Sequence, residues 1–393
     1  MNEIISVEKF KIQYPMLWRK IDILCHGLRC DNEGLLDFYY RQQNPHDTKR
    51  TGNAGLQIKI DSKIKDIGRL ALNVAVYKDF CKDSPYYFCK DEKNQLCVID
   101  ERDNILIPVV CPEAHPVWYD KKLLNKNSGK VIGDLILLEG DSTAIASITR
   151  GCLYFNKTAP CKFCAIGADN VSQEEIVSRR NELLSALEIV AHDKNITNFH
   201  LTGGNTFNSD RGALDFIPYI RAILKSRPDA AIAVEISPPE LSCQETVFRQ
   251  LKSEGVHSIT MNIEFWDEAS RLELMPLKGA IPKEEYMAAY RTALQIFGKN
   301  KVTCGFIIGL ENLQASKAGI NAITSENIIA EVYPFKPNTG SILQNNAISS
   351  TDDMIEISLY ANMRMKENGI SPDMCSGCVK CGACGLTQQL INI

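Results

Sequence analysis

The chain has 393 residues, of which 45% are hydrophobic and 23% charged, and its formal net charge is −4. This composition is typical of a folded globular protein and excludes wholesale disorder. No stretch approaches the roughly 18 consecutive apolar residues of a membrane span, and no long basic run indicates nucleic-acid binding. The first residues lack the apolar core of a signal peptide, so we expect a cytoplasmic protein without a membrane or nucleic-acid partner.

Short alternating apolar segments, such as 56–60 and 105–110, are separated by turn-forming residues in the first part of the chain. This pattern predicts a small N-terminal α+β domain over residues 1–135. A polar, turn-rich stretch at 122–134 marks its end.

Apolar runs then alternate with amphipathic helical stretches. Six of these runs are strand candidates: 144–149, 196–202, 231–237, 258–264, 302–308 and 329–335. Strand–helix–strand repeats with short links predict parallel strands, and near-continuous apolar character is typical of a sheet covered on both faces. We therefore predict an α/β fold, a partial (β/α)6 TIM-like barrel over residues 136–345. Residues 346–393 should form a helix and a cysteine-rich metal-binding tail.

Seven of the 15 cysteines fall in two tight groups: Cys152, Cys161 and Cys164, and then Cys375, Cys378, Cys381 and Cys384. Such groups in a cytosolic chain favour metal binding over disulfides. The second group has one cysteine every third residue. Four such ligands could close around an iron–sulfur cluster, a single iron or a zinc ion, and their spacing does not choose between these.

The three-cysteine group follows the first strand of the barrel series. Barrel enzymes place their chemistry at this C-terminal end of the strands. A structural zinc takes four ligands, and three thiolates would blunt the Lewis acidity of a catalytic zinc. A [4Fe–4S] cluster held by three cysteines instead leaves one iron open to a small molecule. The group is therefore interpreted as a cofactor site.

The loop 150–167 resembles the cluster loop of the radical SAM superfamily, in which the open iron binds the amino and carboxylate groups of S-adenosylmethionine (SAM). Eight residues separate Cys152 from Cys161, a longer first gap than is usual in that family. By this resemblance Phe163 packs near the adenine. Other short matches imply further SAM contacts, which are Thr202, Gly203, Gly204 and Asn205 at the methionine amino group, Glu235 at the ribose, and Gly305, Ile307 and Gly309 beside the adenine.

A few polar and aromatic residues near the same strand ends are weaker candidates. Glu264 and Arg271 are expected to contact substrate or the SAM carboxylate. Tyr154, Asn156 and Trp266 are candidate catalytic residues.

The segments PCKFCAIG, EISPPE, GFIIGLE and MCSGCVKCGACGL resemble radical SAM proteins encoded beside bacterial nitrilase-type gene clusters, and enzymes of arsinothricin synthesis. The resemblance implies an oxygen-sensitive enzyme that cleaves SAM reductively to a 5′-deoxyadenosyl radical acting on a small molecule. A flavodoxin or ferredoxin would donate the electron. One alternative is transfer of the 3-amino-3-carboxypropyl group of SAM to a soft acceptor such as trivalent arsenic. Others are an iron–sulfur electron carrier without SAM chemistry and a zinc protein.

Overall fold

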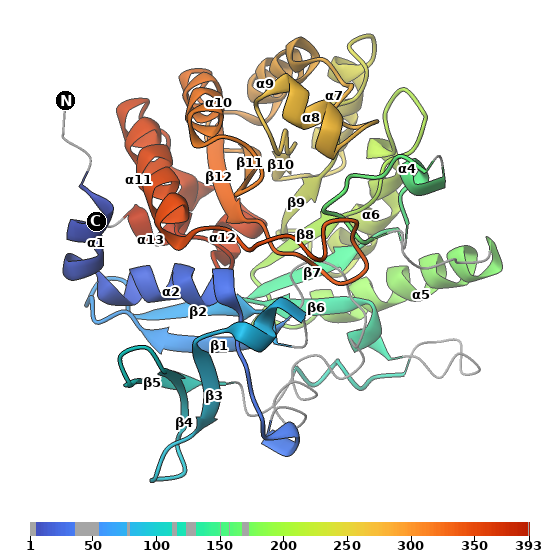
Figure 1. The fold of residues 1–393 in the computed structure, drawn as a ribbon. Coiled ribbons are helices and arrows are strands. Elements are labelled where there is room, and N and C mark those ends of the chain that lie inside the picture. The colour runs from blue at the N-terminus through green and yellow to red at the C-terminus, as the bar shows by residue number, and fades with distance from the viewer. Residues whose placement is uncertain are drawn as a thin grey trace.

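The computed structural model describes residues 5–35, 55–76, 79–111, 116–122, 131–149, 151–156, 158–166, 173–391 and 393. Two sheets organise this part of the chain, one of seven strands and one of five. Figure 1 shows the five-stranded sheet and the first helices below the larger sheet and its helices.

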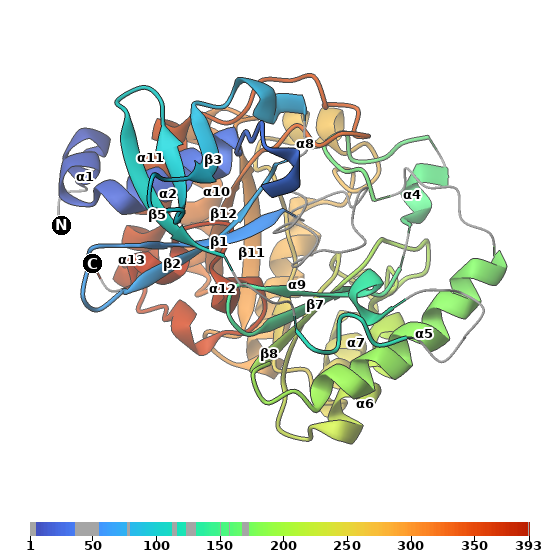
Figure 2. The same ribbon diagram turned by 90° about the horizontal axis from the view of Figure 1, so that it is seen from below.

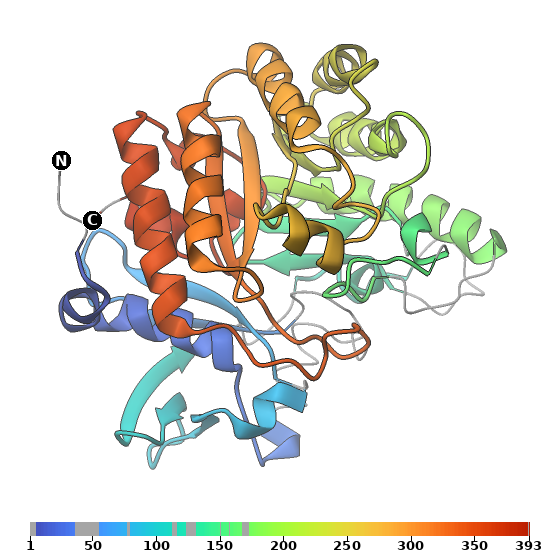
Figure 3. The same ribbon diagram turned by 45° about the horizontal axis from the view of Figure 1, so that its top comes forward.

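The seven-stranded sheet has the order β12-β11-β10-β9-β8-β7-β6. Strands β7 to β12 pair in parallel with one another. The sheet curls into a half-barrel with helices on its outer face (Figure 3). The six parallel strands predicted from the sequence are confirmed. Their bounds are β7 (Thr143–Ser147), β8 (Asn198–Thr202), β9 (Ala231–Glu235), β10 (Ser258–Thr260), β11 (Val302–Ile308) and β12 (Ile329–Pro334).

Amphipathic helices cover the outside of the half-barrel because their apolar residues recur every three or four positions. In α9, for example, Tyr286, Ala289, Tyr290, Ala293 and Phe297 are all buried. Side chains cap several helix starts, such as Asp267, which accepts from the Ser270 N–H. The helices are α5 (Gln173–Ala191), α6 (Ile217–Ser226), α7 (Gln244–Ser253), α8 (Glu268–Leu274), α9 (Lys283–Phe297), α10 (Leu313–Ser325) and α11 (Thr351–Glu367).

One strand of the half-barrel was not among the predicted strands. β6 (Ile136–Glu139) pairs antiparallel with β7, from Ile136 opposite Ala146 to Glu139 opposite Thr143. Gly140, with a φ of 61°, begins the turn between the two strands. A four-residue strand is too short to show a clear hydrophobic period.

Among the described residues, the N-terminal region has a sheet of order β2-β1-β5-β4-β3 and includes helices α1 and α2. All its strand pairs are antiparallel. Its elements are α1 (Val7–Gln13), α2 (Pro15–His26), β1 (Leu56–Asp61), β2 (Arg69–Val74), β3 (Tyr86–Lys90), β4 (Leu96–Asp100) and β5 (Ile105–Val110). Short 3-10 helices are η1 (Asp79–Asp83), η2 (Ile132–Asp134), η3 (Ala213–Phe216) and η4 (Pro372–Met374).

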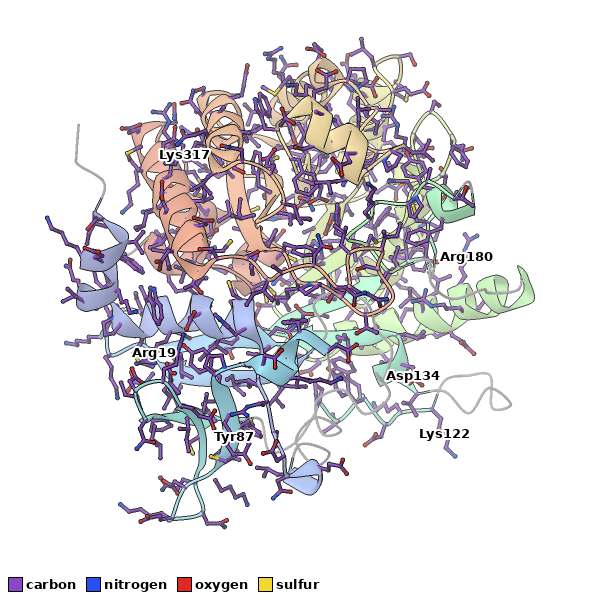
Figure 4. All side chains as sticks on the ribbon, in the orientation of Figure 1. Arg19, Tyr87, Lys122, Asp134, Arg180 and Lys317 are labelled. Carbon is purple, nitrogen blue, oxygen red and sulfur yellow. The ribbon has the colours of Figure 1, made fainter. Side chains whose placement is uncertain are left out.

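A buried polar network joins α2 to the smaller sheet and to helix α11. Arg19 projects from α2 toward the smaller sheet (Figure 4) and pairs with Asp100 on β4. Asp22, one turn further along, accepts from the hydroxyls of Tyr86 on β3 and Thr351 on α11, each at 2.5 Å. The network therefore ties the N-terminal region to the last helix of the half-barrel.

The cysteine-rich tail closes the half-barrel at the N-terminal ends of its strands. The Gly377 N–H donates to Asn198 Oδ1 at 2.7 Å, and Ser376 bonds to Ser258; both partners begin strands. The tail also contacts the N-terminal region, because Lys20 Nζ of α2 donates to the Gly382 carbonyl at 2.6 Å. Figures 1 and 2 both show α12 (Cys378–Cys381) and α13 (Thr387–Leu390) between the larger sheet and the N-terminal elements.

Among the described residues, every helix is too short or too polar to traverse a lipid bilayer.

Candidate functional site

Cys152, Cys161 and Cys164 lie in the segment that follows β7, at the C-terminal end of the half-barrel. The long gap between the first two contains a single helical turn, α4 (Leu153–Asn156). The Leu153 N–H that begins this turn donates to the Asn205 carbonyl at 3.0 Å. The additional residues thus pack against the loop after β8.

The loop after β8 supports the cysteine loop through its backbone. A Cβ on Gly204 would lie 2.2 Å from the Gly151 carbonyl oxygen and 2.6 Å from Cys152 Cα, so only glycine fits. The next residue, Asn205, donates its backbone N–H to Cys152 Sγ at 3.3 Å. A hydrogen bond to sulfur favours the thiolate, which is the form that binds metal.

The Cys164 N–H donates to the Cys161 carbonyl at 3.0 Å, and the electrostatic influence of Cys152 on both thiols indicates that Cys152 lies near them. Burial raises the pKa of Cys164 to about 11, and the neighbouring Cys152 raises it further. Burial likewise raises the pKa of Cys161, with smaller contributions from the other two thiols. Without a metal, burial thus favours the neutral thiols of Cys161 and Cys164, and metal binding would replace their protons. This donor set fits the three protein ligands of an open-site [4Fe–4S] cluster.

A buried ion pair lies beside Cys161. Lys278 Nζ donates to Glu264 Oε1 at 2.9 Å, and the two side chains are only 12% and 10% exposed. Burial raises the pKa of Glu264, while the Lys278 charge opposes that change. Burial would lower the pKa of Lys278, but Glu264, Tyr286 and Cys161 raise it overall. Lys278 was missed in the sequence because it lies in a loop without a motif.

The backbone of Glu264 has an unusual conformation for a residue with a side chain. Its φ is 66°, and its N–H donates to the Gly305 carbonyl at 3.1 Å in an isolated bridge to β11. Such left-handed residues cost about 1–3 kcal/mol and cluster at functional sites.

Glu235 joins a hydrogen-bond chain across the interior of the half-barrel. Its Oε2 lies 2.9 Å from His200 Nε2, and its Oε1 accepts from Asn262 Nδ2 at 2.8 Å. Asn262 Oδ1 in turn accepts the Gly305 N–H at 2.9 Å, and a Cβ on Gly305 would lie 2.5 Å from that oxygen. The contact explains the glycine on β11. Burial would raise the pKa of Glu235, but His200 and Lys278 lower it overall.

Residues 146–316, which include the end of β7, all three loop cysteines and β11, match the sequence profile of the Radical SAM superfamily. The chain contains a radical SAM domain. Members of this superfamily are enzymes that use an iron–sulfur cluster and SAM; residues 146–316 resemble their shared domain, and the chain is an enzyme. No curated protein matches the chain.

Several solved structures are similar to the chain at low identity. Methylornithine synthase (PylB) is 13% identical, with a TM-score of 0.44 over 58% of this chain and 64% of that one. HydG, a maturase of the [FeFe]-hydrogenase, is 14% identical, with a TM-score of 0.43 over 58% of this chain and 50% of that one. A radical SAM methyltransferase from Sphaerobacter thermophilus is 15% identical, with a TM-score of 0.42 over 76% and 80%. The chain thus spans less than two thirds of the first two proteins.

Several residues assigned to the adenine lie together in the radical SAM domain. Phe163 and Ile307 pack in one apolar cluster with Cys161, and the Phe163 ring meets that of Phe265 edge-on at 5.7 Å. Gly309, at the end of β11, has a φ of 109°, and a Cβ there would lie 2.7 Å from Ser349 Oγ. Glycine is therefore required at that turn.

The other predicted substrate-contact and catalytic residues make contacts with neighbouring side chains and backbone. Arg271 is 2% exposed, and its Nη2 donates to the Ile281 carbonyl at 2.6 Å. The Trp266 ring lies 5.0 Å below the ammonium group of Lys283. Tyr154 is buried, with its ring 5.6 Å from that of Phe207. The side chain of Asn156 lies outside the described residues.

The tail cysteines form a second candidate metal site at the opposite end of the half-barrel. Burial raises the pKa of Cys384 to about 12, although the charges of Lys336 and Lys20 oppose this. Burial also lowers the pKa of Lys20 to about 8 and raises that of Glu331 to about 7. No three of the described His, Cys, Asp and Glu side chains are arranged to hold one metal ion.

Proposed function

We propose that this enzyme cleaves SAM reductively at a [4Fe–4S] cluster held by Cys152, Cys161 and Cys164. The observation that carries the proposal is the grouping of these three thiols at the C-terminal end of the strands, with the Asn205 N–H donating to Cys152 Sγ. When bound, the cluster would supply an open iron for SAM and the electron that breaks one of its carbon–sulfur bonds. The expected product is a 5′-deoxyadenosyl radical that abstracts hydrogen from a small-molecule substrate.

The chain would bind SAM with groups from several strand ends. The backbone of 202–205 is assigned to the methionine amino group, and Glu235 to the ribose. Phe163, with the β11 residues Gly305, Ile307 and Gly309, is assigned to the adenine. The apolar packing of Phe163 and Ile307 supports the last assignment, because it would exclude water from the ring.

The SAM carboxylate has Lys278 as its strongest cationic candidate. Lys278 lies beside Cys161 and bonds to Glu264, whereas the Arg271 guanidinium is directed to the Ile281 carbonyl and to the Tyr286 ring. The Lys278–Glu264 pair would hold the charged end of SAM, and Arg271 would hold the loop that carries Lys278.

Two further parts belong to this proposal. An external flavodoxin or ferredoxin would supply the electron, because the cleavage is a reduction. The tail cysteines would bind a second metal centre, either an iron–sulfur cluster, a single iron or zinc.

Product analysis tests the proposal. Anaerobically reconstituted protein is reduced with dithionite in the presence of SAM, and we expect 5′-deoxyadenosine. The product 5′-methylthioadenosine would instead indicate 3-amino-3-carboxypropyl transfer, the alternative that the resemblance to arsinothricin-synthesis enzymes suggests. Neither product, with both clusters loaded, would favour an electron carrier and overturn the proposal.

Matched variants identify the site. Changing Cys152, Cys161 and Cys164 to Ala should abolish SAM cleavage. Cys243→Ser is the control, because this partly exposed thiol bonds to carbonyls of Ser209 and Glu240. Cleavage that survives the triple change would refute the ligand assignment.

A further inference from the structure

The four tail cysteines, equally spaced in the sequence, divide into two sets in space. Cys375 Sγ lies 3.6 Å from the Thr303 hydroxyl on β11. The residue is 5% exposed and packs in an apolar cluster with Ile329, Met365, Ile370 and Val379. Cys375 is thus held against the wall of the half-barrel as a small buried side chain.

The other three cysteines lie on one short stretch around α12. Helix α12 carries Cys378 and Cys381 one turn apart, and Gly382, with a φ of 62°, ends this helix so that Cys384 can return. A Cβ on Gly140 would lie 3.1 Å from Cys381 Sγ.

Glu331 on β12 supplies a buried oxygen that lacks a partner. The residue is 3% exposed, and its Oε2 accepts no hydrogen bond from the described residues. An unpaired buried oxygen of this kind is costly and calls for a ligand. The chain next to Cys384 packs against the strand that carries Glu331, because a Cβ on Gly385 would lie 3.0 Å from the Val332 carbonyl oxygen of β12.

His200 Nδ1 is a second buried atom without a partner near the tail. It is directed at Gly377, where a Cβ would approach it to 2.7 Å. The tail backbone therefore covers this nitrogen, and its other ring nitrogen is engaged by Glu235 at 2.9 Å. Glu331 is the better candidate for a fourth ligand.

We propose that the tail binds a [4Fe–4S] cluster through Cys378, Cys381, Cys384 and Glu331, and that Cys375 is not a ligand. The proposal extends the second metal centre of the proposed function and chooses among its three possibilities. Ferredoxin loops also wrap one cluster with two-residue gaps between three cysteines and take the fourth ligand from elsewhere. Each ligand of a cluster binds a different iron, so the four need not converge on one point as zinc ligands do. Lys20 and Lys336 lie beside the thiols and offset their negative charge.

The test uses the full chain with Cys152, Cys161 and Cys164 changed to Ala, so that bound iron belongs to the tail. After anaerobic reconstitution we expect about four irons and four sulfides per chain. Adding Cys375→Ser should leave iron content and the electron paramagnetic resonance (EPR) spectrum of the reduced cluster unchanged. Adding a Ser change at Cys378, Cys381 or Cys384 should reduce bound iron several-fold. Circular dichroism checks that each variant is folded.

The Glu331 variants test the fourth ligand. Glu331→Gln should lower bound iron by about a quarter and give an oxidised three-iron EPR signal. Glu331→Cys should restore the iron and shift the spectrum. His200→Ala is the matched control and should leave both unchanged. Four results would each overturn the proposal. They are loss of the cluster in Cys375→Ser, an unchanged spectrum in folded Glu331→Gln, a spectral change confined to His200→Ala, and zinc bound in place of iron.

These measurements need no SAM chemistry. A failure of the proposed function therefore leaves their outcome unaffected, and the reverse also holds.

Discussion

Substitution of Gly204 by Ala should empty the three-cysteine site. The new Cβ would lie 2.2 Å from the Gly151 oxygen and 2.7 Å from Cys152 Cβ. Ordinary carbon contacts are roughly 3.5–4 Å, so the cysteine loop must retreat by roughly 1 Å. Functional sites tolerate displacements of only about 0.5 Å. Overpacking of this kind costs about 1–3 kcal/mol, which a stable domain can survive.

The assay is iron content after anaerobic reconstitution, with the thermal unfolding midpoint as a check on folding. Iron bound by Gly204→Ala should fall to the level of the chain in which Cys152, Cys161 and Cys164 are all Ala. Gly151→Ala, in the same segment, is the control, because a Cβ there meets no atom within 4 Å. Full iron loading in Gly204→Ala, or equal losses in both glycine variants, would refute the packing argument.

Three other parts of the molecule give predictions. Lys278→Met leaves Glu264 buried without its partner and should lower the free energy of unfolding by about 3–5 kcal/mol. Adding Glu264→Gln should recover part of this loss in denaturant titrations. Equal stability of the single and the double variant would contradict a coupled pair. Hydrogen bonds hold the pKa of Asp22 below its ordinary value despite burial. The wild type should therefore lose stability as pH falls below about 4, whereas Asp22→Asn should be less stable at neutral pH and depend less on pH. Parallel stability profiles of the two proteins in acid denaturation would contradict a stabilising role of the Asp22 charge. Cys89 and Cys97 are directly opposed on β3 and β4 with sulfur atoms 3.4 Å apart, so oxidised glutathione should link them, and mass spectrometry after alkylation should detect the bond; two free thiols after oxidation would show that they do not pair.

The half-barrel could be predicted from the sequence because its strands are apolar runs and its helices show a clear period. β6 could not, because four residues give too little pattern and its pairing with β7 is formed only in the folded chain. The N-terminal boundary at residue 135 stays a prediction. Its strands were recognisable as short alternating segments, but their pairing order requires contacts distant in sequence.

The candidate site was predictable where local spacing carries the chemistry. Cys152, Cys161 and Cys164 follow a strand and therefore share one end of the half-barrel. Lys278 was missed because only the fold brings it to Glu264.

The roles of the tail residues could not be predicted from sequence spacing either. Regular spacing makes its four cysteines look equivalent, whereas in the structure Cys375 packs against Thr303 and apolar side chains. Glu331 lies within an apolar strand, where nothing in the sequence distinguishes a ligand from a buried charge.

The central claim, that the three-cysteine loop holds a cluster to which SAM binds directly, is tested most directly by EPR. The chain with Ser at Cys378, Cys381 and Cys384 is reconstituted, reduced, and measured with and without SAM. A signal of one cluster whose spectrum changes on addition of SAM, and which is absent when Cys152, Cys161 and Cys164 are Ala, is the predicted result. A cluster signal that SAM leaves unchanged, in protein that also yields no SAM cleavage product, would contradict the account.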